Sequence, residues 1–322
     1  SLLPPLETAF DLFLQLRERR LERGSIDFDL PEPQIVLDIE EGIATSIVKT
    51  SRNQAHMLIE EFMIAANEAV ATFAADQEWP MIYRIHDFPD SEKIADFKNL
   101  AHGLGYALPP IDRLTPKHLA SIVKEVQGKP HERLVNTLLL RSLKQAVYSP
   151  HNVGHFGLAS EKYTHFTSPI RRYPDLIVHR RLHELLQNSS KTSKKKDHAI
   201  TMQKLESMAD HCSKMERNAM KAEWAVRDLH VALFMKDKVG EEYEGIISSV
   251  TKFGIFVEIN DFFVEGLVPL YTILDDHYEF LEKHHELLGK KTKKRFKIGD
   301  AVKIRVVKSD IIMRRVEFEF VR

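Results

Sequence analysis

The sequence predicts an α+β protein with two domains. Antiparallel strands packed with several helices are expected over residues 1–238, and a β-barrel of the OB-fold type over residues 239–322. With 322 residues, the chain is long enough for two cores. Apolar residues recur at helical spacing through much of the chain up to about residue 235. From Glu241 the spacing changes to short alternating runs separated by turn residues, which is typical of a small barrel.

Composition and charge exclude several classes of protein. A hydrophobic content of 43% and a charged content of 29% are ordinary for a soluble globular protein, and no apolar run approaches the length of a membrane span. The net charge of −1 argues against a protein that coats nucleic acid indiscriminately, although a basic channel balanced elsewhere remains possible. The single cysteine, Cys212, excludes an internal disulfide and a cysteine-based zinc site. We therefore expect a reducing compartment, the cytoplasm.

The first elements are expected from local signals. A helix over residues 6–23 is predicted by its apolar spacing and by Gly24, which suits the position after a helix. Three alternating runs are then expected to form an antiparallel meander, over residues 25–29, 34–39 and 42–49. Asn53 is a typical N-cap for the long helix that follows, to about residue 75.

The middle of the chain alternates between short strands and helices. We expect strands at residues 81–86 and within 146–158, and helices at residues 89–104, 115–128 and 131–143. Residues 188–197 are basic and polar and predict a solvated loop. A long helix is expected from residue 198 to about residue 235.

A polar turn edged by aromatic residues lies at residues 163–182, and the chain is organised around it. Proline is tolerated in the first turn of a helix, so the regular helix is expected to begin near Pro174, with Asp175 in its first turn. Arg171 and Arg172 would then lie at the helix entrance, where guanidinium groups and free backbone N–H groups can bind a phosphate. The alternative is a surface arginine pair that binds neighbouring carbonyl groups.

Acidic residues on two helices are further candidates. On the helix after Asn53, Glu60 and Asn67 lie on one face, and Glu61 is next to Glu60. Glu223 lies on the last long helix. The alternatives are a solvated stripe for Glu60, Glu61 and Asn67, and an ion pair one turn away for Glu223.

The barrel region contains candidates for base stacking and phosphate binding. Phe253, Phe256 and Phe263 could stack on bases or belong to the barrel core, and Phe253 before Gly254 is preferred because stacking needs a partly exposed ring. The run that ends at Arg295 forms a positive patch that could contact an RNA backbone or remain a solvated loop. Its lysines are Lys290, Lys291, Lys293 and Lys294.

The stretch Ser-Pro-Ile-Arg-Arg-Tyr-Pro-Asp-Leu-Ile-Val-His-Arg, residues 168–180, resembles a segment of the ribonuclease R/ribonuclease II family, the RNB-domain exoribonucleases. The resemblance extends over residues 6 to 322 and is closer to the ribonuclease R branch. It implies that Arg171 contacts the phosphate at the scissile bond. Arg172 and Tyr173 are expected to assist in RNA binding at the same turn.

Other segments carry the same resemblance. The run Ile-Glu-Glu-x-Met-Ile-x-Ala-Asn is similar to a family segment whose glutamate lies near the terminal nucleotide, which implies this place for Glu60, with Glu61 as the alternative. Glu223 matches a glutamate that lines the nuclease pocket. Phe28 is similar to the aromatic residue that clamps stacked nucleotides, although a core phenylalanine is the rival interpretation. With Lys252-Phe-Gly-Ile-Phe256, the last domain resembles the S1-type RNA-binding domain.

The family implies Mg²⁺, held by an aspartate cluster of the form Asp-x₅-Asp-x-Asp-Asp. No such string occurs in this sequence, so we expect the ligands to precede residue 1 in a full family member. The leading hypothesis is the C-terminal part of a processive 3′-to-5′ exoribonuclease acting on single-stranded RNA, with little activity by itself. The alternative is a non-catalytic RNA-binding module. A truncated β core would expose strand edges, so dimerisation is also expected.

Overall fold

The computed structural model describes residues 2–28, 33–38, 44–49, 52–129, 131–189, 201–281 and 286–321. The chain divides into two compact units. The first unit comprises Ser1–Phe28, Arg52–Gln127 and Leu138–Asn218, and the second comprises Asp29–Ser51, Gly128–Thr137 and Ala219–Arg322. The expected loop at residues 188–197 lies mostly outside the described residues. No described helix is long and apolar enough to cross a membrane.

The first helix, α1 (Leu3–Arg23), begins with prolines in its first turn and ends where the sequence predicts. Gly24 has φ +100° and donates its N–H to carbonyl groups of the last turn. A Cβ at this position would lie 2.6 Å from Lys117, the second residue of α4 (Pro116–Val126). Glycine is therefore required both by the backbone conformation and by the close approach of the two segments.

The strand expected at residues 25–29 is wrong for its described part. Residues 25–28 belong to no strand, and the N–H of Ile26 instead donates to the carbonyl of Gly157 at 2.9 Å. Alternation of apolar and polar residues matches a strand, but no strand pairs with this segment. The other two runs form an antiparallel hairpin in the second unit, β1 (Pro33–Leu37) and β2 (Ala44–Lys49), with Ile35 opposite Ile47.

Helix α2 (Gln54–Asp76) begins as predicted, because the side chain of Asn53 accepts the N–H of His56 at 3.0 Å. The helix start near Pro174 is also confirmed, as α6 runs over Tyr173–Ser189. The remaining elements of this region follow the expected order. They are β3 (Tyr83–Ile85), α3 (Ser91–Gly103), α5 (Glu132–Ser142), β4 (Val147–Ser149) and α7 (Met202–Lys236).

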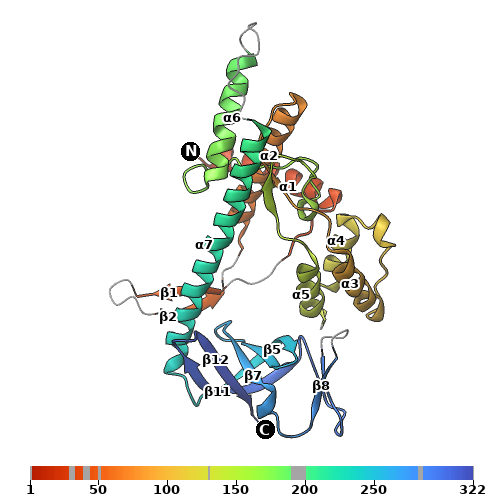
Figure 1. Cartoon of the computed structure of the whole chain (residues 1–322), viewed down its shortest axis with the longest axis vertical. Helices are drawn as coiled ribbons and strands as arrows, with labels where there is room; N and C mark the ends of the chain where they lie inside the picture. The colour runs from red at the N-terminus through yellow and green to blue at the C-terminus, as the bar shows by residue number, and fades with distance from the viewer. Residues whose placement is uncertain are drawn as a thin grey trace. The chain divides into compact units, whose positions relative to one another are not determined.

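Helix α6 lies at the centre of the first unit. Its residue Val178 packs with Ala71 and Ala74 of α2, whereas its neighbour Ile177 packs with Leu205 and with other residues of α7. Because successive residues of a helix point about 100° apart, one helix can serve two core clusters. Figure 1 shows α2, α6 and the first part of α7 running alongside one another.

The second unit contains the predicted barrel. Its strands are β5 (Glu242–Thr251), β6 (Gly254–Ile259), β7 (Glu265–Pro269), β11 (Ala301–Asp310) and β12 (Arg315–Phe320), closed in the order β11-β12-β7-β6-β5. Gly266 allows the ring of Phe318 into the barrel interior, since a Cβ there would lie 2.4 Å from the ring. A three-stranded sheet, which the sequence did not predict, consists of β8 (Tyr278–Leu281), β9 (Glu286–Gly289) and β10 (Arg295–Lys297).

Candidate nucleic-acid interface

The turn before α6 is held by one buried carboxylate. Asp175, which is 0% exposed, accepts the backbone N–H of Ser168 at 2.7 Å and the Arg172 guanidinium at 2.8 Å. Arg171 is exposed, and its guanidinium makes no hydrogen bond or ion pair with the described residues. The two arginines therefore differ: Arg172 stabilises the turn, and Arg171 is available to a ligand. Tyr173 beside them is half-exposed.

The chain leading into this turn is supported by Asn67 of α2. The side-chain amide of Asn67 donates to the hydroxyl of Tyr163 at 3.0 Å and accepts the N–H of Phe166 at 2.9 Å. The ring of Phe166 stacks on that of His179, with 4.1 Å between the ring centroids. The alternative of a solvated stripe is wrong for Asn67, because Asn67 is buried and positions the turn.

Two partly buried histidines, His155 and His165, precede α6 in the sequence. Burial lowers the pKa of His155 to about 3 and that of His165 to about 2, and neighbouring positive charges act in the same direction. His165 is hydrogen-bonded through Nδ1 to the hydroxyl of Tyr148 at 2.8 Å. At neutral pH both imidazoles are therefore uncharged and stabilise the first unit; neither is suited to exchange protons with a substrate.

Asp27 and Glu60 are connected through one arginine. Arg52 donates to Asp27 Oδ1 at 2.7 Å and to Glu60 Oε2 at 2.7 Å, and Arg17 donates to Asp27 Oδ2 at 2.9 Å. Burial acts to raise the pKa of Asp27, but the hydrogen bond and charge of Arg52 and the neighbouring arginines hold it below its usual value. The arginine therefore connects the segment of Phe28, which is partly buried, to Glu60.

The neighbouring glutamates of α2 have different environments. Glu61 is 2% exposed and accepts hydrogen bonds from both Nε and Nη2 of Arg20, at distances of 2.7–3.0 Å. The side chain of Glu60 is 36% exposed and can be reached by a ligand. Glu60 is thus the better candidate for contact with RNA, and Glu61 belongs to the core of the first unit.

Glu223 is exposed on α7, in the second compact unit, and has no ion-pair partner among the described residues. The alternative of an ion pair one turn away is therefore wrong within the described part of the chain. An acid on the preceding part of α7, Glu216, pairs instead with Arg84 of β3, at 2.7 Å. Arg171 and Glu60 both belong to the first unit. That these two residues and Glu223 line one pocket stays a prediction.

The described residues contain no group of three or more His, Cys, Asp or Glu side chains that could hold a metal ion. Asp27, which precedes Phe28 in the sequence, lies within ion-pair distance of Arg17, Arg20 and Arg52, which disfavours a cation. The residues that the structure describes therefore do not fit the magnesium site that the family implies.

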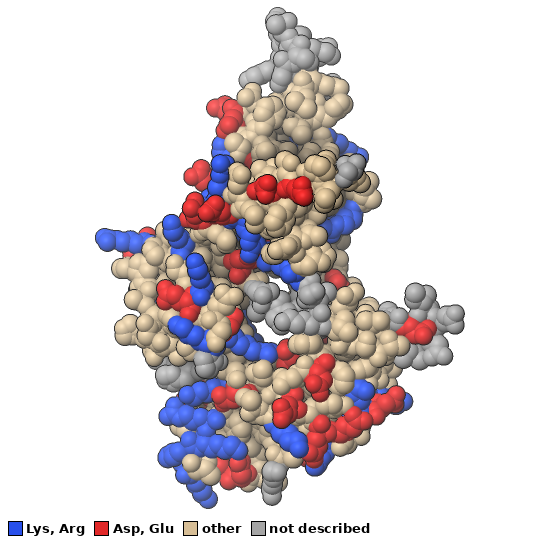
Figure 2. Space-filling model, turned by 180° about the vertical axis from the view of Figure 1, so that it is seen from behind, with Lys and Arg blue, Asp and Glu red and all other residues tan. Residues whose placement is uncertain are grey.

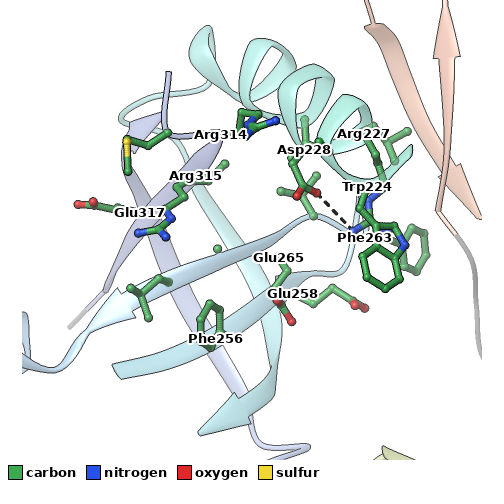
Figure 3. A pocket seen from close by; sticks show the side chains of 18 of the residues that line it. Trp224, Arg227, Asp228, Phe256, Glu258, Phe263, Glu265, Arg314, Arg315 and Glu317 are labelled. Atoms are coloured by element: carbon green, nitrogen blue, oxygen red, sulfur yellow. Dashed lines mark hydrogen bonds and ion pairs between the residues drawn. The ribbon is translucent and has the colours of Figure 1, made fainter. Parts of the chain in front are cut away.

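A cavity of about 820 Å³ lies beside the barrel in the second unit (Figure 3). Phe253, which is 54% exposed, and Phe256 both line it, and their rings make an edge-to-face contact with centroids 5.9 Å apart. Phe263 lines it as well, with φ +53°. The stacking candidates are therefore brought together on one partly open surface, which Arg314 and Arg315 also line.

The lysine run forms the turn between β9 and β10, fixed by Asp276. Asp276 accepts the backbone N–H groups of Lys291 and Thr292, at 2.9 and 2.6 Å, and the hydroxyl of Thr292 at 2.7 Å. Burial acts to raise the pKa of Asp276, but these hydrogen bonds lower it to about 2. Lysine and arginine side chains gather at the lower left of Figure 2, over this part of the second unit.

The lysines of this turn are not equivalent. Lys290 pairs with Glu279 at 3.7 Å, and Lys294 pairs with Asp275 at 3.3 Å. Lys291 and Lys293 are exposed and have no ion pair within the described ranges. These two side chains are the most available for contact with a phosphate.

Comparison with known proteins gives two domain matches. A model of the RNB domain matches residues 2–188, and a model of the S1 RNA binding domain matches residues 236–319. Ribonuclease R of Aquifex aeolicus (strain VF5) is 46% identical over 321 residues, which cover 100% of this chain and 45% of that protein. Ribonuclease R of Escherichia coli (strain K12) is 38% identical over 320 residues, 98% of this chain and 39% of that protein.

Solved structures agree with these matches. The apo form of Mycoplasma genitalium RNase R gives a TM-score of 0.90 at 32% identity and covers 98% of this chain and 49% of that chain. The same protein in complex with ribose methylated single-stranded RNA gives the same values. The chain thus spans less than half the length of these relatives.

Proposed function

Because the chain belongs to the RNB-domain family, we propose that it is part of a processive 3′-to-5′ exoribonuclease that hydrolyses single-stranded RNA to 5′-nucleotides. The observation that carries the proposal is the turn before α6. Asp175 holds Arg172 inward, and Arg171 is left exposed and unpaired among the described residues. A free guanidinium at a helix entrance suits a phosphate, which it can bind through two charge-assisted hydrogen bonds.

The other candidate residues have subsidiary roles in this proposal. Glu60 and Phe28 would contact the last nucleotides of the strand, and Tyr173 would lie beside them. Glu223 would complete the pocket. In the S1-type domain, Phe253 and Phe256 would stack on bases of the incoming strand, and the lysine turn would contact its backbone. The boundary between the domains is proposed after residue 238, and the match of the S1 model from residue 236 supports it.

We propose that the Mg²⁺ required by the family has ligands that are not among residues 1–322, because the described residues gather no suitable carboxylates. The bound ion would activate water for attack on the phosphodiester. The residues of this chain would hold the strand and stabilise its phosphate. A cytoplasmic location fits this role. The expected dimerisation has no support in the comparisons, and the alternative of a non-catalytic module is not favoured, since the relatives named above are ribonucleases R.

A binding experiment with a matched control tests the role of Arg171. The affinity of the 322-residue chain for a 5′-fluorescein RNA with a free single-stranded 3′ end would be measured by anisotropy at fixed salt. Arg171→Gln is expected to weaken binding by roughly tenfold, the effect of losing a charge-assisted phosphate contact. Arg180→Gln removes the same charge from an exposed position of α6 and is expected to have little effect. Equal losses for both variants would contradict the role of Arg171.

A degradation assay with Mg²⁺ on the same RNA tests the metal assignment. The chain alone is expected to hydrolyse RNA poorly. Robust turnover that disappears in Arg171→Gln would show that residues 1–322 contain the metal ligands, contrary to the proposal.

A further inference from the structure

The part of α7 that lies in the second unit presents an unusual face to the barrel cavity. Lys221, Trp224, Asp228 and Val231 all line this cavity, at intervals of three, four and three residues. This spacing places them on one side of the helix. A helix face directed at a barrel is ordinarily apolar and covered, but here half of these side chains are charged and one is a large aromatic group.

Trp224 is 49% exposed and makes no hydrogen bond or ring contact with the described residues. Indole is the largest side chain available for packing, and burying it contributes strongly to stability, so half-exposure leaves a substantial aromatic face open. In Figure 3, Trp224 comes from the helix side of the cavity, and Phe256 and Glu258 come from a strand. The cavity therefore has aromatic groups on more than one of its walls.

The cavity lining carries four basic and four acidic side chains, which differ in their pairing. Asp228 pairs with Arg227 at 3.3 Å and Glu258 with Arg133 at 3.0 Å. Glu265 accepts the hydroxyl of Ser248 at 2.5 Å, and neither it nor Glu317 has an ion-pair partner in the described part of the chain. Three lining cations also have no ion-pair partner among the described residues, namely Lys221, Arg314 and Arg315, so the unpaired cations outnumber the unpaired acids by one.

We propose that Trp224 stacks on a base of single-stranded RNA, so that α7 and the barrel together form one nucleotide-binding cavity. The flanking phosphates are bound by Lys221, Arg314 and Arg315. The volume of about 820 Å³ lies within the range of roughly 300–1,000 Å³ that accommodates small organic ligands, which suits a nucleotide with its neighbouring phosphate. Stacking on an aromatic ring tolerates any base, as a processive enzyme requires. The inference rests on the proposed function, because it takes RNA as the ligand.

Intrinsic fluorescence provides a direct test, because the chain has only two tryptophans. Trp79 lies in the first unit, with the Arg181 guanidinium 4.7 Å from its ring centroid. Titration of the 322-residue chain with a single-stranded oligoadenylate is expected to quench emission, and this quenching should be absent in Trp224→Phe. Anisotropy of a fluorescein-labelled copy of the same oligonucleotide would be recorded in parallel.

Affinity provides the second readout. Trp224→Ala is expected to weaken binding by about 5- to 100-fold, the range that follows from losing one base–aromatic stack, and Trp224→Phe to restore part of the loss. Val226→Ala is the matched control, because Val226 is similarly exposed on α7 but does not line the cavity. Its affinity and quenching should equal those of the unmodified chain.

The outcomes separate this inference from the proposed function. If the unmodified chain binds RNA, but its quenching is unchanged in Trp224→Phe or its affinity is unchanged in Trp224→Ala, the inference is overturned and RNA binding stands. If the unmodified chain does not bind RNA at all, the proposed function fails as well. If Trp224→Ala impairs folding, the inference is tested by comparing the quenching of the unmodified chain with that of Trp224→Phe.

Discussion

Replacing Glu61 by glutamine will remove the main counter-charge of the buried Arg20 guanidinium and leave only Asp27, at 4.0 Å. Arg20 is 5% exposed and Glu61 is 2% exposed, so water cannot replace the lost carboxylate. Glutamine has nearly the same shape, so the change removes charge without opening a cavity. Breaking a buried pair from one side destabilises proteins by about 3–5 kcal/mol, and the hydrogen bond that Arg20 keeps with Ser25 at 2.7 Å places the expected loss near the lower end, about 3 kcal/mol.

A second ion pair between the same two helices is the control. Arg23 and Glu68 also connect α1 and α2, at 2.6 Å, but their side chains are substantially exposed. Pairs in contact with water contribute about 0–1 kcal/mol, so Glu68→Gln is expected to have a small effect. The comparison therefore isolates burial, because helices, residue types and substitution are otherwise matched.

Urea unfolding followed by the fluorescence of Trp79 would measure both variants. A Trp224→Phe background makes Trp79 the only tryptophan, so the signal reports on the first unit. The free energy of unfolding follows from the midpoint and slope of the transition. If Glu61→Gln loses less than about 1 kcal/mol, or no more than Glu68→Gln, then the buried pair does not stabilise the fold as argued here.

Two further predictions concern stability. Burial lowers the pKa of His155 to about 3 and that of His165 to about 2 in the folded state, so below about pH 6.5 the unfolded chain binds more protons than the folded one. The free energy of unfolding should therefore fall as the pH decreases, by up to roughly 1.4 kcal/mol per pH unit for each histidine. Equal urea midpoints at pH 7.5 and 5.5 would contradict this. Gly266→Ala should destabilise the barrel by about 1–3 kcal/mol, because its Cβ would meet the ring of Phe318. The midpoint measured through Trp224 would then decrease, whereas Gly103→Ala, with nothing within 4 Å of the added Cβ, should not destabilise the protein.

Helix ends could be predicted because their causes are local. Gly24, Asn53 and Pro174 act through their own backbone conformation or through a side-chain contact three residues away, and each marks a helix end close to where the sequence predicts it. The barrel was also predictable, since short alternating runs and the turn residues between them can be recognised in the sequence. Residues 25–28 show the limit of such patterns, because alternation predicts a strand and no partner strand lies beside them.

The sequence by itself determined the family, the helix ends, the barrel and the list of side chains able to contact RNA. The tertiary structure alone decided which of two neighbours is buried and which is exposed. Glu60 and Glu61 are adjacent, but only Glu61 meets Arg20, which lies 41 residues away, and only Arg172 reaches the buried Asp175, which leaves Arg171 exposed. The physical reason is that adjacent residues leave the backbone in different directions, and whether a charge is buried depends on partners that only folding brings near.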